Sequence, residues 1–485
     1  MTFIPQTFLD HLTQQSLDKE SLDDFITSCQ TPLRKSIRLN TLKINADEFS
    51  AIAKQKNWQL TPIPWCAEGF WVNPLNEQHP MDSLGLSVEH LQGLFYIQEA
   101  SSMLPPVALA SLIQSPQQLL DMAAAPGSKT TQMAAHFDPS INLVANELSS
   151  SRLKVLHANV VRCGVTNVAL SHLDGREFGD KSPGLFDAIL LDAPCGGEGT
   201  VRKDPDALKN WSPEALRDIA STQKQLISSA YQALKPGGVL VYSTCTLSEE
   251  ENQHICQHLL TQHSDMNAIS LAQLFPEASK CVTNEGYLHV FPHLFDSEGF
   301  FVAAFKKEDN ASSHIEYSVK PPKRWPFDPI SKKQYSQISN YFDQQFGFNL
   351  EPLKQQLWLR DNAVWYLPQG SLTVANQFRI DRAGIKIAEL HKNRIKTQHE
   401  FIMAFGGQIT LNSQALTHQQ AVDYYRGKDI HLDQTNAASN AFGNSLSGKG
   451  ECMITYHNQP LGLCKQVSGR LKNSLPRPLV QDNAE

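Results

Sequence analysis

The chain has 485 residues, of which 41% are hydrophobic and 19% are charged, and its formal net charge is −7. A single hydrophobic core rarely organises so many residues, so we expect two to four domains. The negative net charge argues against non-specific binding of nucleic acid over the whole protein surface. Any contact with nucleic acid must therefore use local basic patches.

The nine cysteines form no Cys-x-x-Cys pair and have no histidine partners at the spacing of zinc ligands. This pattern favours neither a disulfide framework nor a metal site. The sequence also has no apolar leader and no apolar stretch long enough to cross a bilayer. We therefore expect a cytoplasmic protein that binds no metal and no membrane.

Two basic patches stand out, although solvated surface charge is the simpler interpretation of either one alone. The first consists of Arg34, Lys35, Arg38 and Lys43. The second consists of Arg379, Arg382, Lys386, Lys392, Arg394 and Lys396. Between them, residues 308–330 are polar and rich in proline, which predicts a linker.

From about residue 117 the chain alternates short apolar runs with helical patterns, which is typical of a doubly wound parallel sheet in an α/β fold. Five strands are predicted at residues 119–124, 142–145, 168–173, 186–191 and 239–242. Helices are predicted at 149–163 and 213–234, and Ser248-x-x-Glu251 reads as a capping box that opens another helix. Two further apolar runs, 287–291 and 300–305, predict an antiparallel pair that closes the sheet.

Polar or reactive residues stand at the ends of all five predicted parallel strands, where open α/β sheets bind their ligands. In chain order they are Asp121 with the loop 123–129, then Glu147, Asp174, Asp192 with Cys195, and Cys245. Such a row is difficult to explain by structure alone. It predicts an active site along one edge of the sheet.

The loop after the first strand indicates a nucleoside cofactor. Glu147 lies 20 residues beyond Gly127, the offset at which an acidic side chain reaches a ribose hydroxyl. Asp174 has an equally good alternative role as the cap of the turn that follows it. The loop lacks the glycines of a phosphate-binding loop and of a dinucleotide fingerprint. S-adenosylmethionine fits better, because it has a ribose but no pyrophosphate.

Cys195 and Cys245 differ from the other cysteines because both follow predicted strands at the ligand edge. Cys245 also precedes the predicted capping box, so a helix dipole is expected to lower its pKa. A thiolate that adds to carbon 6 of cytosine makes carbon 5 nucleophilic enough to accept a methyl group. Asp192 is placed to stabilise the adduct as an acid near ring nitrogen 3, and the second thiol can assist breakdown of the adduct.

Three segments carry a specific resemblance to a known family: 121–130 (DMAAAPGSKT), 192–199 (DAPCGGEG) and 235–246 (KPGGVLVYSTCT). They resemble the RNA 5-methylcytosine methyltransferases, the NSUN or RsmB/RsmF group. The resemblance implies that Cys245 is the nucleophile and that Cys195 promotes release of the product. DNA cytosine methyltransferases use the Pro-Cys thiol as nucleophile instead, so the paired cysteines favour RNA. The implied cofactor contacts are Ala123, Ala124, Ala125, Pro126, Gly127, Ser128, Lys129, Glu147, Asp174 and Asp192.

The resemblance implies a Rossmann-like S-adenosylmethionine-dependent methyltransferase domain at residues 96–307, closed by an antiparallel strand. An N-terminal α+β RNA-binding domain is expected at 1–95, and a β-rich region with a PUA-like module at about 380–480 is expected within 331–485. In that module, the second basic patch with Arg426 and Lys428 is expected to contact RNA phosphates. Arg202 and Lys203 are expected to guide the target strand.

The substrate implied by the resemblance is 16S ribosomal RNA in the 30S subunit, with cytosine 1407 as the target. Two alternatives remain open from the residues. One is a methyltransferase that acts on transfer RNA. The other is a non-catalytic RNA-binding or assembly protein, which would have no use for two such thiols.

Overall fold

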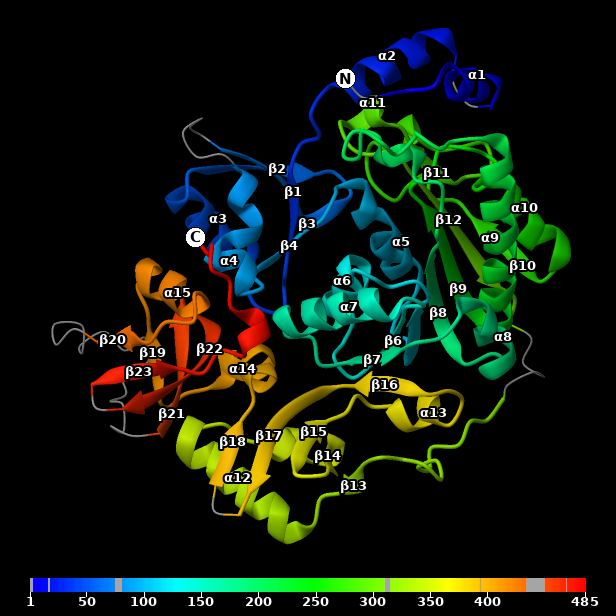
Figure 1. Ribbon diagram of the computed structural model, residues 1–485. Coiled ribbons are helices and arrows are strands. Elements are labelled where there is room, and N and C mark those ends of the chain that lie inside the picture. The colour runs from blue at the N-terminus through cyan, green and yellow to red at the C-terminus, as the bar shows by residue number, and fades with distance from the viewer. Residues whose placement is uncertain are drawn as a thin grey trace.

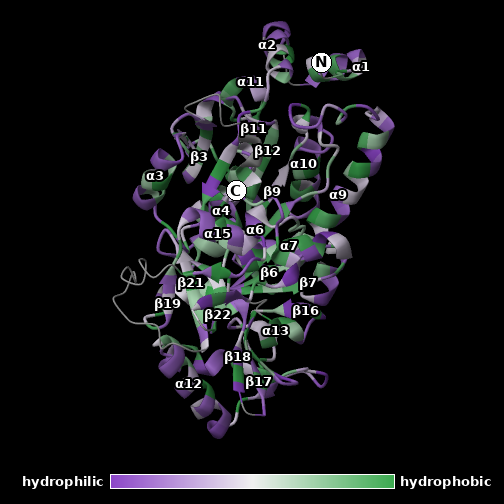
Figure 2. Cartoon of the chain, turned by 60° about the vertical axis from the view of Figure 1, so that its left-hand side comes forward, coloured by the Kyte–Doolittle hydropathy of each residue, from purple (hydrophilic) through white to green (hydrophobic). Residues whose placement is uncertain are grey.

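The computed structural model describes residues 3–15, 18–74, 81–309, 315–392, 394–432, 450–467 and 469–485. These residues form four β-sheets with their helices, and the largest sheet contains the five predicted parallel strands (Figure 1). In Figure 2 hydrophobic residues gather in the central strands, whereas α12 (Lys332–Phe346) is largely hydrophilic. None of the described helices is long and apolar enough to cross a bilayer.

The N-terminal part contains a four-stranded sheet in the order β2-β3-β1-β4. Its strands are β1 (Ser36–Leu39), β2 (Trp58–Ile63), β3 (Cys66–Pro74) and β4 (Phe95–Ile97), with helices α3 (Ala46–Gln55) and α4 (Val88–Leu91). The preceding helices α1 (Gln6–Gln15) and α2 (Lys19–Gln30) lie apart from this sheet, beside α11 (Pro292–Phe295) (Figure 1). Their buried Phe8, Leu12 and Phe25 share a cluster with Val201 and Leu247, which follow two strands of the central sheet.

The central sheet has the order β10-β12-β9-β8-β5-β6-β7-β16, and β11 pairs with β12. The strands are β5 (Gln118–Asp121), β6 (Asn142–Asn146), β7 (Val168–Ser171), β8 (Phe186–Asp192), β9 (Leu234–Thr244), β10 (Met266–Ile269), β11 (Leu288–Val290), β12 (Phe300–Lys307) and β16 (Ile380–Ala383). The five parallel strands and the antiparallel β12 confirm the predicted doubly wound sheet with its closing strand.

Helices cover both faces of this sheet because its strands are apolar on both sides. Successive residues such as Leu119 and Leu120, or Leu190 and Leu191, enter different clusters. One cluster includes residues of α5 (Leu104–Leu112), α6 (Ser128–His136) and α7 (Ser150–Arg162). The other includes residues of α8 (Phe178–Lys181), α9 (Pro213–Ala233) and α10 (Gln253–Gln262).

Two five-stranded sheets form the C-terminal part, as expected for a β-rich region. The first contains β13 (Asp328–Pro329), β14 (Leu357–Arg360), β15 (Ala363–Tyr366), β17 (Ile385–His391) and β18 (Arg394–Thr397), with α12. The second contains β19 (Ser413–Ala415), β20 (Ile430–His431), β21 (Gly450–Tyr456), β22 (Gln459–Val467) and β23 (Arg470–Asn473). The remaining helices are α13 (Ser371–Ala375), α14 (His399–Phe405) and α15 (His418–Tyr425).

The part of the chain that contains the first C-terminal sheet is joined to the central sheet through β16. This strand pairs antiparallel with β7. Just before β16, Phe378 packs edge-to-face on Phe178 of α8, with ring centroids 5.2 Å apart. Residues 315–327, part of the predicted linker, run irregularly to β13, and residues 310–314 lie outside the described residues. The β7 edge of the catalytic sheet is therefore completed by residues 380–383.

Phe378→Ala should lower the free energy of unfolding by about 3–5 kcal/mol, because it removes a buried ring from the core. The native side chain is only 6% exposed. Phe3, which is 60% exposed, provides the matched control, and Phe3→Ala should change that free energy by less than about 0.5 kcal/mol. Urea denaturation followed by fluorescence measures both changes. Equal effects of the two substitutions would contradict this packing.

Candidate active site

The strand ends that the sequence singled out lie along one edge of the central sheet. β5 pairs in parallel with both β6 and β8, so the chain winds away from β5 in two directions. The loops that follow these strands open at this switch point, which is where doubly wound sheets bind ligands. The structure thus brings the loop 123–129, Glu147 and Asp192 to one edge.

The loop between β5 and α6 is shaped for close contact with a ligand. Gly127 has φ of +109°, and a Cβ at this position would lie 2.8 Å from Leu156 Cδ1. Two side chains of α7 hold the loop carbonyls: Arg152 Nη2 donates to Ala125 O at 2.6 Å, and Asn159 Nδ2 donates to Pro126 O at 2.9 Å. The backbone of the loop is therefore fixed by contacts outside it.

Glu147 is the buried carboxylate at the end of β6, and it is 4% exposed. Its Oε1 accepts from the amide of Ser149 at 2.8 Å, and its Oε2 lies 3.4 Å from Arg152 Nη1. Asp174 instead caps the turn after β7, as the alternative interpretation predicted, and its side chain accepts from the backbone and side chain of Arg176. The hydrogen bonds from Arg176 lower the pKa of Asp174.

Asp121 and Thr130 form a buried pair beneath the cofactor loop, with Thr130 Oγ1 donating to Asp121 Oδ2 at 2.6 Å. Burial raises the pKa of Asp121 to about 7. Its second oxygen is buried without a partner among the described residues. The fixed loop, the left-handed glycine and the carboxylate of Glu147 together fit the nucleoside part of S-adenosylmethionine.

Asp192, at the end of β8, is held by two neighbours. Lys129 Nζ donates to Asp192 Oδ2 at 2.7 Å, and Ser243 Oγ donates to Asp192 Oδ1 at 2.7 Å. Burial alone would lower the pKa of Lys129, but the carboxylates of Asp192 and Asp121 outweigh it and raise that pKa. Lys129 therefore keeps its proton beside Asp192.

The two predicted cysteines meet because β8 and β9 are neighbouring parallel strands, paired with Asp192 opposite Ser243. Cys195 Sγ lies 3.0 Å from Cys245 Sγ, and the amide of Cys245 donates to Cys195 Sγ at 3.3 Å. Both thiols are free and half-buried, whereas the other seven cysteines are fully buried. The hydrogen bond with Cys245, together with burial, raises the pKa of Cys195 well above its ordinary value.

Two buried carboxylates that the sequence analysis did not assign to the site tie the cysteine loops together. Glu198 accepts from the amides of Leu247 and Ser248, and also from the side chains of Thr246, Ser248 and Trp211. Glu251 accepts from the amide of Gly196 at 3.0 Å and from Gln223 Nε2 at 2.7 Å. Burial raises the pKa of Glu251 to about 7.

The predicted capping box is therefore wrong. α10 begins at Gln253, and its N-cap Asn252 makes no capping hydrogen bond through its side chain. Ser248 and Glu251 face Glu198 and the Pro-Cys loop instead. The helix consequently starts well after Cys245, and the expected dipole effect on this thiol lacks its structural basis.

Contacts within the protein hold Arg38 and Lys43 of the first basic patch, and also Arg202, which is expected to guide the target strand. Arg38 is 3% exposed and donates to Ser128 O and Thr131 Oγ1. Lys43 donates to the carbonyls of Gln92 and Arg162. The Arg202 side chain is 1% exposed and binds Asp296 at 2.7 Å and the carbonyl of Pro32. These cations are satisfied by long-range partners that sequence patterns do not reveal.

The C-terminal basic residues are divided between paired and free groups. Lys386 pairs with Glu389, Lys428 pairs with Asp423, and Arg426 donates to the carbonyl of Ala484. Arg379 forms no ion pair with another described residue, and Arg382 contacts His157. Within the described part of the chain, no three histidine, cysteine or acidic side chains group as metal ligands.

Known families match almost the whole chain. Residues 108–306 match the model of the 16S rRNA methyltransferase RsmB/F family, and residues 4–100 match the N-terminal domain of 16S rRNA methyltransferase RsmF. Residues 327–405 match the pre-PUA domain of ribosomal RNA small subunit methyltransferase F, and residues 411–481 match the RsmF PUA domain. The cations from Arg379 to Lys396 thus fall in the pre-PUA match.

Among solved structures, a methyltransferase homologue from Pyrococcus horikoshii is 31% identical, with a TM-score of 0.51, and the match covers 63% of this chain and 100% of that one. NSun6 from the same organism, solved with SFG, is 22% identical, with a TM-score of 0.53 over 62% of this chain and 98% of that one. This second likeness shows the fold alone.

Two relatives are similar along almost their full length. Proteins named ribosomal RNA small subunit methyltransferase F from Escherichia coli and from Shigella boydii are each 47% identical over 99% of this chain and 97% of their own. Together with the catalytic fold and the paired thiols, this similarity shows that the chain belongs to the ribosomal RNA small subunit methyltransferase F family, S-adenosylmethionine-dependent RNA methyltransferases of the RsmB/F group.

Proposed function

We propose that this enzyme methylates carbon 5 of one cytosine in 16S ribosomal RNA through a covalent bond between Cys245 and carbon 6. The observation that carries the proposal is the pair of thiols, 3.0 Å apart, at the ends of β8 and β9. A structural role would not require two half-buried thiols at the ligand edge of the sheet. Relatives named for the small ribosomal subunit support the class of substrate.

Carbon 5 of cytosine is too weak a nucleophile to accept a methyl group without activation. In the proposed reaction, the Cys245 thiolate forms a bond to carbon 6, and the displaced electron pair makes carbon 5 nucleophilic. S-adenosylmethionine, when bound, supplies an electrophilic methyl group. Loss of the proton on carbon 5 and departure of the Cys245 sulfur then restore the aromatic ring.

Asp192 is the proposed acid at ring nitrogen 3, where the adduct needs a proton. Lys129, which keeps its own proton, donates to Asp192 Oδ2 at 2.7 Å. Ser243 holds the other carboxylate oxygen, so the orientation of the side chain is fixed. These contacts give Asp192 a defined position beside the cysteine pair.

Cys195 is the proposed group that promotes release. Its pKa is raised by Cys245 and by burial, so it remains a thiol until the reaction changes its surroundings. Its proton can pass to Cys245 Sγ, 3.0 Å away, as that sulfur leaves carbon 6, and the Cys195 thiolate that results accepts the proton lost from carbon 5. The cofactor is proposed to contact Ala123–Lys129, Glu147, Asp174 and Asp192, with Glu147 accepting from the ribose hydroxyls.

The substrate proposed within this class is the 30S particle, with cytosine 1407 of its 16S RNA as the target, in the cytoplasm. The match to a PUA domain supports binding to structured RNA. A cavity of about 430 Å³ lies next to the loop that continues from Cys195, and its lining includes Arg34, Lys35 and Lys203. These cations are proposed to contact the phosphates of the target strand. The target base must leave its stack to reach the thiols.

Transfer of labelled methyl from S-adenosylmethionine to separate pools of transfer RNA, 16S RNA and 30S particles tests the proposal. We expect label in 30S particles, and we expect Cys245→Ala to reduce it at least about a thousandfold, because no other group activates carbon 5. Label confined to transfer RNA would show that transfer RNA is the substrate instead. No label in any pool would favour the non-catalytic RNA-binding alternative.

Cys195→Ala should accumulate a covalent complex with RNA, because the adduct forms through Cys245 but is released slowly. Denaturing gel electrophoresis detects this complex as a band that disappears after nuclease treatment. Cys281→Ala is the control, since this buried thiol lies outside the pair, and it should give no band. Normal turnover by Cys195→Ala without an adduct would contradict the assigned role.

A further inference from the structure

We propose that a cavity beside β16 is a second RNA-binding site, which holds one unpaired nucleotide of the substrate away from the active site. The inference rests on the proposed function, because it assumes that the substrate is RNA. The cavity measures about 530 Å³ and is larger than the one beside the Pro-Cys loop. Its walls come from residues 322–327, 360–365 and 375–383.

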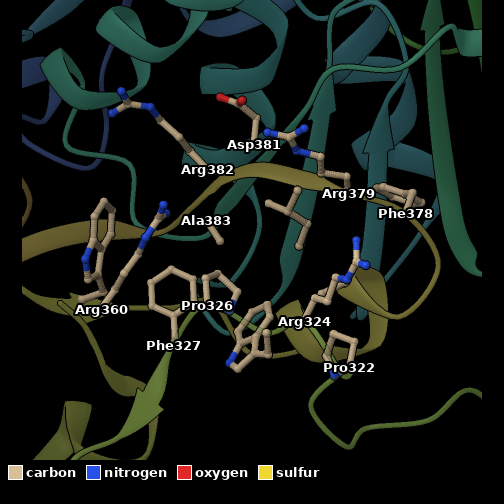
Figure 3. Close-up of a pocket in the computed structure, with 14 residues that line it drawn as sticks. Pro322, Arg324, Pro326, Phe327, Arg360, Phe378, Arg379, Asp381, Arg382 and Ala383 are labelled. Carbon is tan, nitrogen blue, oxygen red and sulfur yellow. The ribbon is translucent and has the colours of Figure 1, made fainter.

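Four arginines line this cavity, namely Arg324, Arg360, Arg379 and Arg382, against a single carboxylate, Asp381. In Figure 3, Arg324 and Arg360 reach up toward β16, whereas Asp381 and Arg382 point from β16 to the other side. Neither Arg324 nor Arg360 forms an ion pair with another described residue, and both are exposed. Their charges are therefore available to an anion such as a phosphate.

Aromatic rings lie on the same wall as these two arginines, and the Arg360 guanidinium is 5.9 Å from the centre of the Phe327 ring. Phe327 packs against Trp325, with ring centroids 5.1 Å apart, and against Trp365 in an edge-on arrangement at 5.9 Å. The indole nitrogens of Trp325 and Trp365 are buried without an acceptor among the described residues. What these two tryptophans offer to a base in the cavity is therefore the face of the ring and not its nitrogen.

This combination matches the chemistry of an unpaired nucleotide better than that of an acidic peptide. Single-stranded nucleic acid is bound by aromatic rings that stack on the bases and by cations that follow the phosphates. Acidic peptides offer carboxylates to the arginines but no flat ring for the tryptophans. A cavity of this volume accommodates one nucleotide.

The cavity is also connected rigidly to the catalytic sheet. β16 is hydrogen-bonded to β7, and four strand spacings, about 19 Å, separate it from β8. Arg382 reaches α7 through His157, at 3.2 Å. A nucleotide held here would fix the register of the substrate while the target base is flipped between the thiols.

The test measures binding of a fluorescent, unstructured 12-nucleotide RNA to the full-length Cys245→Ala protein, so that failure of methyl transfer does not affect the readout. Replacing both Arg324 and Arg360 with Ala should weaken binding about tenfold at low salt. The plot of log affinity against log salt should lose about 1.4 in slope, since each phosphate contact on a single strand contributes about 0.7. Trp365→Leu should weaken binding about fivefold and leave the slope unchanged.

The matched control is the double substitution Lys332→Ala and Lys333→Ala, which removes two exposed cations from α12 in the same part of the chain. It should leave affinity and slope close to those of the parent. Replacing Arg324 and Arg360 with Lys should restore the slope but only part of the affinity, because lysine keeps the charge and loses the planar group. Thermal unfolding verifies that every variant is folded.

Two results would overturn the proposal. One is an equal loss of affinity when Arg324 and Arg360, or Lys332 and Lys333, are replaced with Ala. The other is unchanged binding when Arg324 and Arg360 are replaced with Ala. In the parent protein, photo-crosslinking with RNA that contains 4-thiouridine should label the peptide that spans residues 322–327 or 360–383. Crosslinks confined to other surfaces would also overturn it. If an acidic peptide binds the parent protein, the 12-nucleotide RNA does not, and replacing Arg324 and Arg360 with Ala abolishes peptide binding, the cavity belongs to a protein partner instead.

Discussion

The parallel pairing of β8 with β9 determines where both thiols lie. Asp192 stands opposite Ser243 in this pair, so the loops that continue from these strands leave the sheet side by side. Buried carboxylates then fix the loops, with Glu198 receiving the amides after Cys245 and Glu251 receiving the amide after Cys195. Loss of this arrangement would separate the sulfurs, even if both cysteines remained.

Two groups around the thiol pair, Lys129 and Cys195, have raised pKa values and keep their protons. Lys129 keeps its proton between Asp192 and Asp121, and it donates to Asp192 Oδ2 at 2.7 Å. Burial and the hydrogen bond with Cys245 keep Cys195 protonated. The raised pKa of Cys195 suits its proposed part in release, whereas Cys245 is the proposed nucleophile.

Much of the catalytic sheet could be predicted because apolar periodicity is local, and the strand-end residues followed from it. The roles of Glu251, Arg38 and Arg202 could not, since their partners lie far along the chain. Glu251 also stands in a segment whose sequence resembles a capping box. The pairing of β16 with β7 joins residues about 200 positions apart and leaves no local pattern. Sequence therefore located the two neighbouring thiols but not the contacts that hold them.

The most direct test of the account uses RNA whose cytosine carries fluorine at carbon 5, which blocks release because no proton can be removed. The intact enzyme is incubated with S-adenosylmethionine and this RNA, digested, and analysed by tandem mass spectrometry to locate the modified peptide. The account predicts that the methylated base is attached to Cys245. Attachment to Cys195, or the absence of any covalent complex while methyl transfer to normal RNA proceeds, would contradict it.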